Sequence, residues 1–229
     1  MQTVLTPEHK TGIFIQELKN RFLCEVEIDG ESTVCYVPSS CHLSNFLDLK
    51  GRSVLLAPTQ SKNARTQFAL FAIPYKKNYI LLNTSMANRA VADSIKGRRF
   101  SFLGRRGTIY TEHYVGGYKS DIYIQDTNTI IEVKCVLSTE KCALFPTVFS
   151  ERALKQLEKL RDLLSLGYRV HYSVISLNPY VSSIYFVSDA QFTPLLKSCI
   201  DLGMTISAFS CRIDDNRVYI DKRLQILLP

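Results

Sequence analysis

The chain has 229 residues, of which 46% are hydrophobic, and it carries 28 Lys and Arg against 21 Asp and Glu. This apolar content can fill a sizeable core, which excludes an intrinsically disordered protein, and the length suits one large domain or two small ones. No apolar run approaches membrane-spanning length, and charged residues interrupt the N-terminal segment where a signal peptide would be apolar. We therefore expect a cytoplasmic protein that does not associate with membranes.

Cysteine and histidine spacing argues against disulfides and zinc. The seven cysteines form no C-x-x-C pair and the four histidines lie far apart in the sequence. A disulfide framework and a zinc site both require closer and more regular spacing. We expect reduced, mostly buried thiols and no small-molecule cofactor.

Positive charge is concentrated in one part of the chain. Residues 50–106 contain 12 Lys and Arg and a single acid, Asp93, whereas residues 108–229 carry equal numbers of basic and acidic side chains. A segment with one sign of charge repels itself unless a polyanion binds to it, and nucleic acid is the common partner. A merely solvated basic face is the alternative, but such a face usually contains interspersed acids.

The N-terminal part of the chain is dominated by short strand signals. A clean alternation ends at Asp29-Gly30, which is a strong hairpin turn signal. Five short strands in some seventy residues favour a small barrel, and an OB-like barrel over residues 1–84 is the obvious nucleic-acid-binding candidate. The five predicted strands are 21–28, 33–37, 53–56, 68–73 and 78–82.

A basic helix and connection, residues 85–107, open the second predicted domain, which covers residues 85–229. The helix is expected over 85–96 and is closed by Gly97. The segment that follows interleaves arginines with Phe100 and Phe102. Basic groups can contact phosphates while aromatic rings stack on unpaired bases. The two phenylalanines are more simply explained as core residues, so the arginines are the better candidates for DNA contacts.

The next segment carries an acidic pattern on a predicted β-hairpin. Runs at 121–125 and 129–135 are separated by a polar turn. Glu132 and Lys134 share one strand face, and Asp121 can lie beside them on the partner strand. Two converging carboxylates suit Mg²⁺ or Mn²⁺. A third acid, Glu112, lies on a strand predicted before Gly116-Gly117.

The E-x-K part of this pattern is weak evidence by itself. Glu17-Leu18-Lys19 is a second copy on an ordinary N-terminal segment. A solvated strand face with a weak ion pair is therefore the alternative for Glu132 and Lys134. The full D-x10-E-x-K spacing, in contrast, is that by which one large group of nucleases holds a divalent metal against a phosphodiester.

The remainder of the chain alternates helices and strands. A helix over 150–167 has Ser150 as its N-cap and Gly167 as its stop, and its predicted buried stripe is Leu154, Leu157, Leu160 and Leu164. A strand at 168–177, a helix at about 190–202 and a final strand from Met204 follow. Strand, helix and strand imply a parallel crossover, so we expect an α/β domain with a mixed sheet flanked by helices.

These motifs together resemble one family. They are Arg21-Phe22-Leu23, Val26-Glu27-Ile28-Asp29-Gly30, Leu82-Asn83-Thr84, Asn88, Glu112, Asp121, Ile131-Glu132-Val133-Lys134, Ala143-Leu144-Phe145-Pro146, Arg152 and Lys155. In order and spacing they are similar to the bacterial and archaeal sugar fermentation stimulation proteins. The resemblance implies an N-terminal OB-like domain, a C-terminal PD-(D/E)xK nuclease-like domain, DNA binding without marked sequence preference, and a link to the regulation of maltose metabolism.

The sequence departs from the family pattern in places. Ser39, Ser40 and Cys41 replace part of a Cys-Pro-Asn-Thr-Gly stretch, and Gln156 stands where the family usually has histidine. Lys119 replaces an arginine and Ala153 a glycine. The expected metal-ligand positions are intact, while the altered positions affect how substrate is handled.

Two hypotheses follow, and both require DNA as the partner. In the first, the protein is a Mg²⁺-dependent nuclease with Glu112, Asp121, Glu132 and the Val133 carbonyl as metal ligands, and with Lys134 and Lys155 completing the catalytic group. In the second, it is a non-catalytic DNA-binding regulator that retains the nuclease fold. A carbohydrate-binding barrel has little support, since the chain has no Trp for sugar stacking. The residues expected to contact DNA are Arg65, Arg89, Lys96, Arg98, Arg99, Arg105, Arg106, Lys119 and Arg152.

Overall fold

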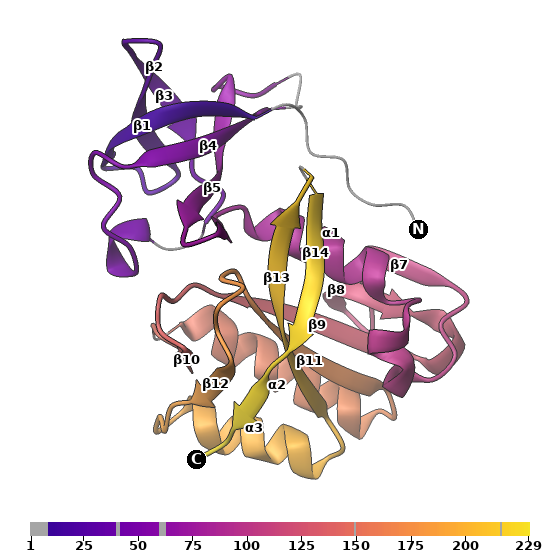
Figure 1. The fold of residues 1–229 in the computed structure, drawn as a ribbon. Coiled ribbons are helices and arrows are strands. Elements are labelled where there is room, and N and C mark those ends of the chain that lie inside the picture. Colours follow the sequence, from indigo (N-terminus) through magenta and orange to yellow (C-terminus); the bar gives the residue numbers. More distant parts are fainter. Residues whose placement is uncertain (1–8, 40–41, 60–62, 149, 216) are drawn as a thin grey trace.

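The computed structural model describes residues 9–39, 42–59, 63–148, 150–215 and 217–229. Two parts are visible in Figure 1: a barrel formed by the N-terminal strands, and a larger α/β part formed by the rest of the chain. Of the family departures named above, Ser40 and Cys41 lie outside the described residues.

The N-terminal part is a closed OB-like barrel, as predicted. Its sheet runs in the order β3-β2-β1-β4-β5-β6, and pairing of Tyr36 with Ala69 joins β3 to β5 and closes the barrel. The barrel therefore includes β1, which the sequence patterns did not reveal, while β6 only extends the β5 hairpin. Gly12 occupies an inward position of β1 and a bulge follows Phe14, so the apolar alternation there is weak. The strands are β1 (Lys10–Glu17), β2 (Leu23–Ile28), β3 (Glu31–Tyr36), β4 (Ser53–Pro58), β5 (Phe68–Tyr75) and β6 (Asn78–Leu81), with a short helix η1 (Leu43–Asn45) before β4.

The second part is built on a mixed six-stranded sheet in the order β14-β13-β11-β9-β8-β7. Its centre is parallel, since β11 pairs in parallel with both β9 and β13, and its outer strands are antiparallel. This mixed sheet was predicted, but β14 was not. The strands are β7 (Ile109–Val115), β8 (Tyr118–Ile124), β9 (Thr129–Val136), β11 (Arg169–Ser176), β13 (Thr205–Asp214) and β14 (Arg217–Arg223).

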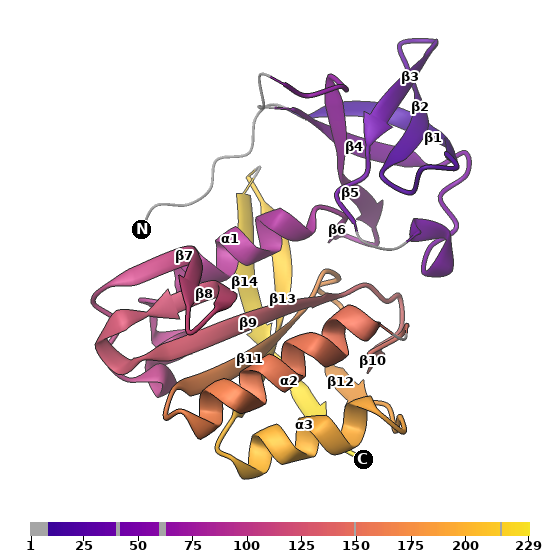
Figure 2. The ribbon, with the colours of Figure 1, turned by 180° about the vertical axis from the view of Figure 1, so that it is seen from behind.

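Helices cover both faces of this sheet. In Figure 2, α2 (Glu151–Ser165) and α3 (Phe192–Asp201) lie together on one face, whereas α1 (Thr84–Ser94) lies on the other, towards the barrel. A small parallel sheet of β10 (Cys142–Phe145), β12 (Ser183–Phe186) and β15 (Gln225–Leu227) was not predicted, because its strands are very short. The remaining elements are the 3₁₀ segments η2 (Arg98–Leu103) and η3 (Gln125–Thr127).

Local signals fix the helix that bears on the site. Ser150 caps α2 as predicted, since its hydroxyl accepts a hydrogen bond from the Ala153 N–H at 3.2 Å. The buried stripe of α2 is Leu157, Leu160 and Leu163, so Leu163 takes the place expected of Leu164, which is only partly buried. Leu154 is also only partly buried, and both it and Leu164 pack against the cluster at the edge of this stripe.

The barrel and the six-stranded sheet share one hydrophobic core. A single cluster of buried side chains includes Val26 and Leu56 from the barrel and Ile122 and Phe209 from the sheet. The Leu81 N–H also donates to the Leu177 carbonyl across the junction, at 3.0 Å. Burial of this apolar surface fixes the barrel against the sheet.

Candidate functional site: a carboxylate pair on a β-hairpin

The site is positioned by two successive hairpins. Gly116 and Gly117 have φ of 57° and 75°, and two residues with positive φ make the tight turn that matches the twist of antiparallel strands. The pairing of Ile122 with Ile131 continues by one step to place Asp121 across from Glu132. Strand pairing thus brings the two predicted carboxylates side by side on neighbouring strands.

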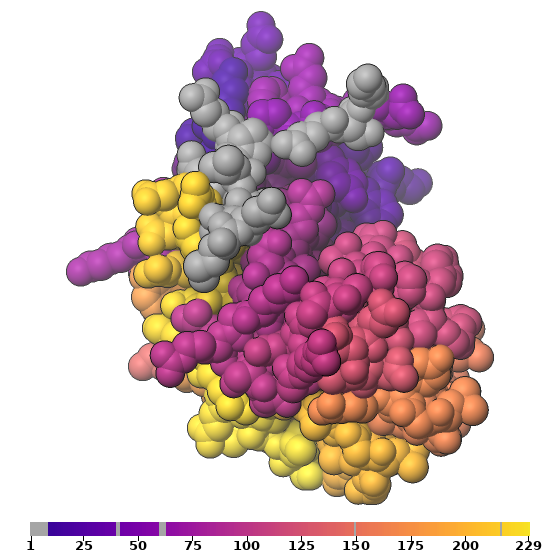
Figure 3. Space-filling model, turned by 90° about the vertical axis from the view of Figure 1, so that its right-hand side faces the viewer, coloured from indigo at the N-terminus to yellow at the C-terminus, as the bar shows by residue number. Residues whose placement is uncertain are grey.

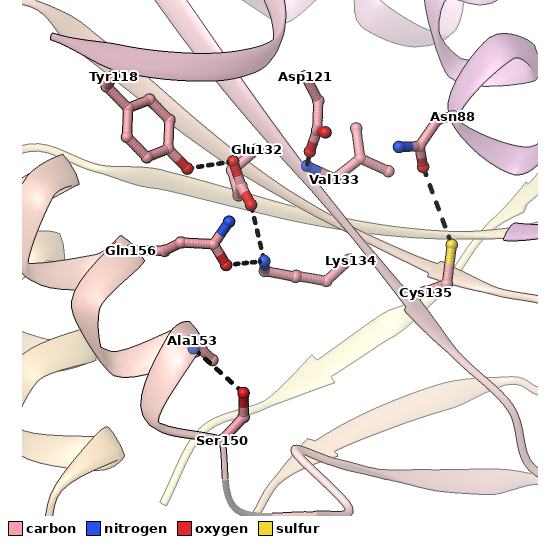
Figure 4. A network of polar contacts seen from close by, with 10 residues as sticks. All are labelled: Asn88, Tyr118, Asp121, Glu132, Val133, Lys134, Cys135, Ser150, Ala153 and Gln156. Carbon is pink, nitrogen blue, oxygen red and sulfur yellow. Dashed lines mark hydrogen bonds and ion pairs between the residues drawn. The ribbon is translucent and has the colours of Figure 1, made fainter. Parts of the chain in front are cut away.

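Glu132 is held from two sides. Its side chain is almost fully buried, with a residue exposure of 2%. The Lys134 ammonium donates to Oε1 at 2.7 Å, and the Tyr118 hydroxyl donates to Oε2 (Figure 4). A buried carboxylate needs such partners to compensate for lost hydration. Burial and the nearby Glu132 charge raise the pKa of Tyr118 well above its usual range, so its hydroxyl stays protonated and remains a donor.

Asp121 is the second acid of the pair. Its Oδ2 accepts a hydrogen bond from the Val133 N–H at 2.8 Å. Burial and then repulsion from Glu132 raise the pKa of Asp121 to about 6, although the Val133 hydrogen bond and Lys134 oppose this. Like charges held close together raise a carboxyl pKa in this way. The pair therefore favours a cation placed between its two members.

The Glu112 carboxylate does not join this pair in a cluster of three, contrary to the prediction, although its charge still contributes to the raised pKa of Asp121. The backbone φ of Glu112 is 50°, which breaks the alternation of β7 at this residue. The carboxylate points into solvent and pairs with Lys119 at 2.8 Å. In the described part of the chain, no group of three His, Cys, Asp or Glu side chains is arranged to hold a metal ion.

Helix α2 contributes Gln156 to the site. The Lys134 ammonium donates to the Gln156 Oε1 at 2.6 Å, as well as to Glu132 (Figure 4). Lys155 and Arg152, both named from the sequence, are exposed on the same helix. The residue that reaches Lys134 is thus the one at which this chain departs from the family histidine. Neither strand nor helix periodicity identified this contact in advance, because it joins two elements distant in the sequence.

Tyr118 is a further site residue that the sequence did not indicate. Counting back by twos from Asp121 assigns Tyr118 to the opposite face of β8, yet its ring packs with the cluster beneath α2 and α3. It occupies the first position of the strand, directly after the Gly116-Gly117 turn. Simple alternation does not hold at such a strand end.

The basic residues named from the sequence are mostly exposed but not all free. Arg99 donates to the Asp221 carbonyl, Arg105 pairs with Asp126, and the half-buried Arg106 donates to the Gly97 carbonyl. The segment 85–107 that carries many of them lies on the face seen in Figure 3, below the barrel and beside the rest of the second domain. Phe100 is fully buried and Phe102 is 40% exposed, so only the first is a core residue as expected. Arg65, Arg89, Lys96, Arg98 and Lys119 are exposed.

A closed five-stranded barrel followed by a helix-flanked mixed sheet defines a two-part architecture, and family models assign both parts. Residues 18–82 match the SfsA N-terminal OB domain, and residues 85–217 match the sugar fermentation stimulation protein RE domain. The chain belongs to the sugar fermentation stimulation protein family. Within the described residues, no helix is long and apolar enough to cross a membrane.

Individual relatives agree with this assignment over nearly the whole chain. A sugar fermentation stimulation protein homolog from Caldanaerobacter subterraneus is 33% identical over 95% of this chain and 96% of its own length. A homolog from Ruminiclostridium cellulolyticum is 27% identical, with coverage of 96% and 97%. The solved structure of Pyrococcus furiosus SfsA in complex with Ca²⁺ is 21% identical, covers 99% of each chain and has a TM-score of 0.85. This last similarity establishes the fold.

Proposed function

We propose that the protein binds DNA and hydrolyses its phosphodiester bonds with Mg²⁺ or Mn²⁺ at the carboxylate pair. The observation that carries this proposal is the grouping of Asp121, Glu132 and Lys134 on one hairpin face, with Lys134 2.7 Å from Glu132. A cluster of opposed charges in which one acid has a raised pKa is typical of functional sites.

The donor set suits a hard divalent cation. Asp121 uses Oδ2 for the Val133 hydrogen bond, and its Oδ1 takes no hydrogen bond from any residue that the structure describes. That oxygen, Glu132 and the Val133 carbonyl are the groups that would hold the ion, with water in its remaining positions. The Pyrococcus furiosus relative was solved with Ca²⁺, which likewise prefers oxygen ligands. When bound, the cation would polarise the scissile phosphate and lower the pKa of an attacking water.

The chain's own residues would orient this chemistry. Lys134 is held between Glu132 and Gln156, so its ammonium has a fixed position from which to neutralise charge that develops on the phosphate. Tyr118 fixes the other oxygen of Glu132 and leaves that carboxylate few orientations. Glu112 and Lys155 lie outside the group that would hold the metal. Lys155 and Lys119 would contact the DNA backbone there.

DNA would be bound mainly by the basic segment. Residues 50–106 carry 12 basic side chains and one acid, and the four residues Arg65, Arg89, Lys96 and Arg98 are exposed. Phosphate contacts of this kind give affinity without sequence preference. Arg99, Arg105 and Arg106 already have carbonyl or carboxylate partners, and their remaining guanidinium donors would serve the phosphates.

A nuclease assay tests the proposal. Wild-type protein is incubated with single-stranded, duplex and branched DNA in Mg²⁺, Mn²⁺ or EDTA. We expect metal-dependent cleavage that falls by at least about a hundredfold in Lys134→Ala, in line with the loss of one group that stabilises transition-state charge. Lys19→Ala, in the second E-x-K copy on the barrel, is the matched control and should cleave like the wild type. Equal cleavage by Lys134→Ala would refute the proposed site.

The second candidate is a DNA-binding protein without hydrolytic activity. The observation that favours it is that both Glu132 oxygens are already engaged while Glu112 points into solvent. Binding of DNA with no cleavage of any substrate in either metal would support this candidate. The role in sugar metabolism that gives the relatives their name would fit either candidate.

A further inference from the structure

We infer that Tyr110, at the open end of a short aromatic stack on β7, stacks on an unpaired nucleobase of the strand bound at the Asp121–Glu132 pair. The inference rests on the proposed function in that it needs nucleic acid at this hairpin, and it adds a preference for locally unpaired substrate. It does not need the bond to be cut.

The stack consists of three rings in sequence. Tyr110 stacks on His113 with ring centroids 4.8 Å apart, and His113 stacks on Tyr123 at 5.4 Å with an interplanar angle of 10°. Exposure increases along the stack, from 8% at Tyr123 to 41% at Tyr110. The inner ring is therefore part of the core, and the outer ring is presented to solvent.

A backbone irregularity creates this arrangement. Tyr110 and His113 are three residues apart and would lie on opposite faces of a regular strand. Tyr110 lies opposite Tyr123 by strand pairing, and the positive φ of Glu112 breaks the alternation so that the His113 ring stacks on both. A non-glycine residue in this region of φ is unfavourable and is retained where the surrounding structure or a function requires it.

The stack lies beside the acidic pair on the same sheet face. Tyr123 and Asp121 are two residues apart on β8, which corresponds to roughly 6.5–7 Å along the strand. The ring of Tyr110 is also held in place, because its hydroxyl donates to Gln125 Oε1 at 3.1 Å. A base seated on a fixed ring next to the pair would keep the adjoining phosphate close to Asp121.

Two exposed cations flank the stack, each in an ion pair with an acidic side chain. Arg105, whose side chain is 85% exposed, lies at the Gln125–Asp126 end of β8 through its pair with Asp126. Lys119 lies at the opposite end of the same strand and is about half exposed. Two cations that flank a solvent-facing ring are the elements of a single-strand site, in which phosphates are neutralised and bases stack.

Fluorescence anisotropy in EDTA tests the inference without hydrolysis. Labelled single-stranded DNA and blunt duplex of the same length are titrated with wild type, Tyr110→Leu and Tyr110→Phe. Leucine keeps apolar bulk but removes the ring, and phenylalanine keeps the ring but loses the Gln125 hydrogen bond. Tyr185→Ala, which removes a half-exposed ring from β12, is the control for loss of any surface tyrosine.

We expect Tyr110→Leu to weaken single-strand binding by roughly 5- to 150-fold, the range for loss of one base–aromatic stack. Duplex affinity should be unchanged, and Tyr110→Phe and Tyr185→Ala should bind both ligands within about twofold of wild type. Equal losses on both ligands, no loss on single strands, or a wild type that binds only duplex would each overturn the inference. A Lys134-dependent nuclease whose Tyr110→Leu variant binds normally would leave the proposed function standing, so the two failures are distinguishable.

Discussion

Replacing Asp121 with Asn should stabilise the metal-free protein at neutral pH. The pKa of this carboxyl rises from 3.8 to about 6 on folding, because it is buried beside Glu132. Between these two values Asp121 ionises in the unfolded chain but stays protonated in the folded chain, so its contribution to stability falls as pH rises and the loss is complete above about pH 6. At about 1.4 kcal/mol per pKa unit, the cost is on the order of 3 kcal/mol. The amide removes this cost and can still accept the Val133 hydrogen bond.

Thermal unfolding in EDTA, followed by circular dichroism at pH 4 to 8, measures the effect. For a chain of this size about 3 kcal/mol corresponds to roughly 6–12 °C, so Asp121→Asn should unfold higher than wild type by this amount at pH 7.5 and by little at pH 4. Asp126→Asn is the matched control. Hydrogen bonds from Thr108 and Gly107 N–H groups lower the pKa of Asp126, so its loss should give no gain at neutral pH. A pH-independent difference for Asp121→Asn would refute the electrostatic explanation.

Further predictions concern metal, pH, charge and packing. Mg²⁺ should raise the Tm of wild type, because a cation that binds the folded state stabilises it by mass action. Glu132→Ala should reduce that shift while DNA binding persists. A full shift in the variant would contradict the assigned ligands. Burial lowers the pKa of His171 to about 3, so the contribution of this neutral side chain to stability should be lost as pH falls from about 6.5 towards 3. His171→Gln should lack this loss, so its Tm should fall less than that of wild type in acid titrations. Gly12→Ala should destabilise the protein by about 1–3 kcal/mol in denaturant unfolding, because its Cβ would lie 2.5 Å from Val26 Cγ1. Replacing four arginines together with alanine should flatten the log–log salt slope of duplex binding by roughly 0.9 for each phosphate that they neutralise. The four are Arg98, Arg99, Arg105 and Arg106. An unchanged slope would mean that they do not touch DNA.

Local sequence rules account for much of the fold and for part of the site. Alternation and turn residues identified the hairpin that carries Asp121 and Glu132, and the Ser150 cap located α2. Each of these features depends on residues close in the sequence. The short strands β10, β12 and β15 pair only with one another and are too brief for a periodic signal.

The site details that were missed depend on irregular backbone or distant contacts. The positive φ at Glu112 is not encoded by residue type, since glutamate seldom adopts it, and it moved a predicted ligand into solvent. The contact between Lys134 and Gln156 requires α2 to pack back over β9, and only tertiary structure shows which side chain of the helix meets the lysine.

The core shared between the barrel and the sheet has a consequence for experiments that dissect the protein. Cutting the chain near residue 84 would expose apolar side chains where β6 meets β13, which now lie in one cluster. A fragment with newly exposed apolar surface tends to aggregate or to bind other molecules non-specifically. DNA affinity measured on an isolated barrel would therefore report the damage of truncation together with any native contact. Point substitutions in the intact chain are the sounder route to locating the DNA-binding surface, and proteolysis should remove the two halves together in one cooperative step.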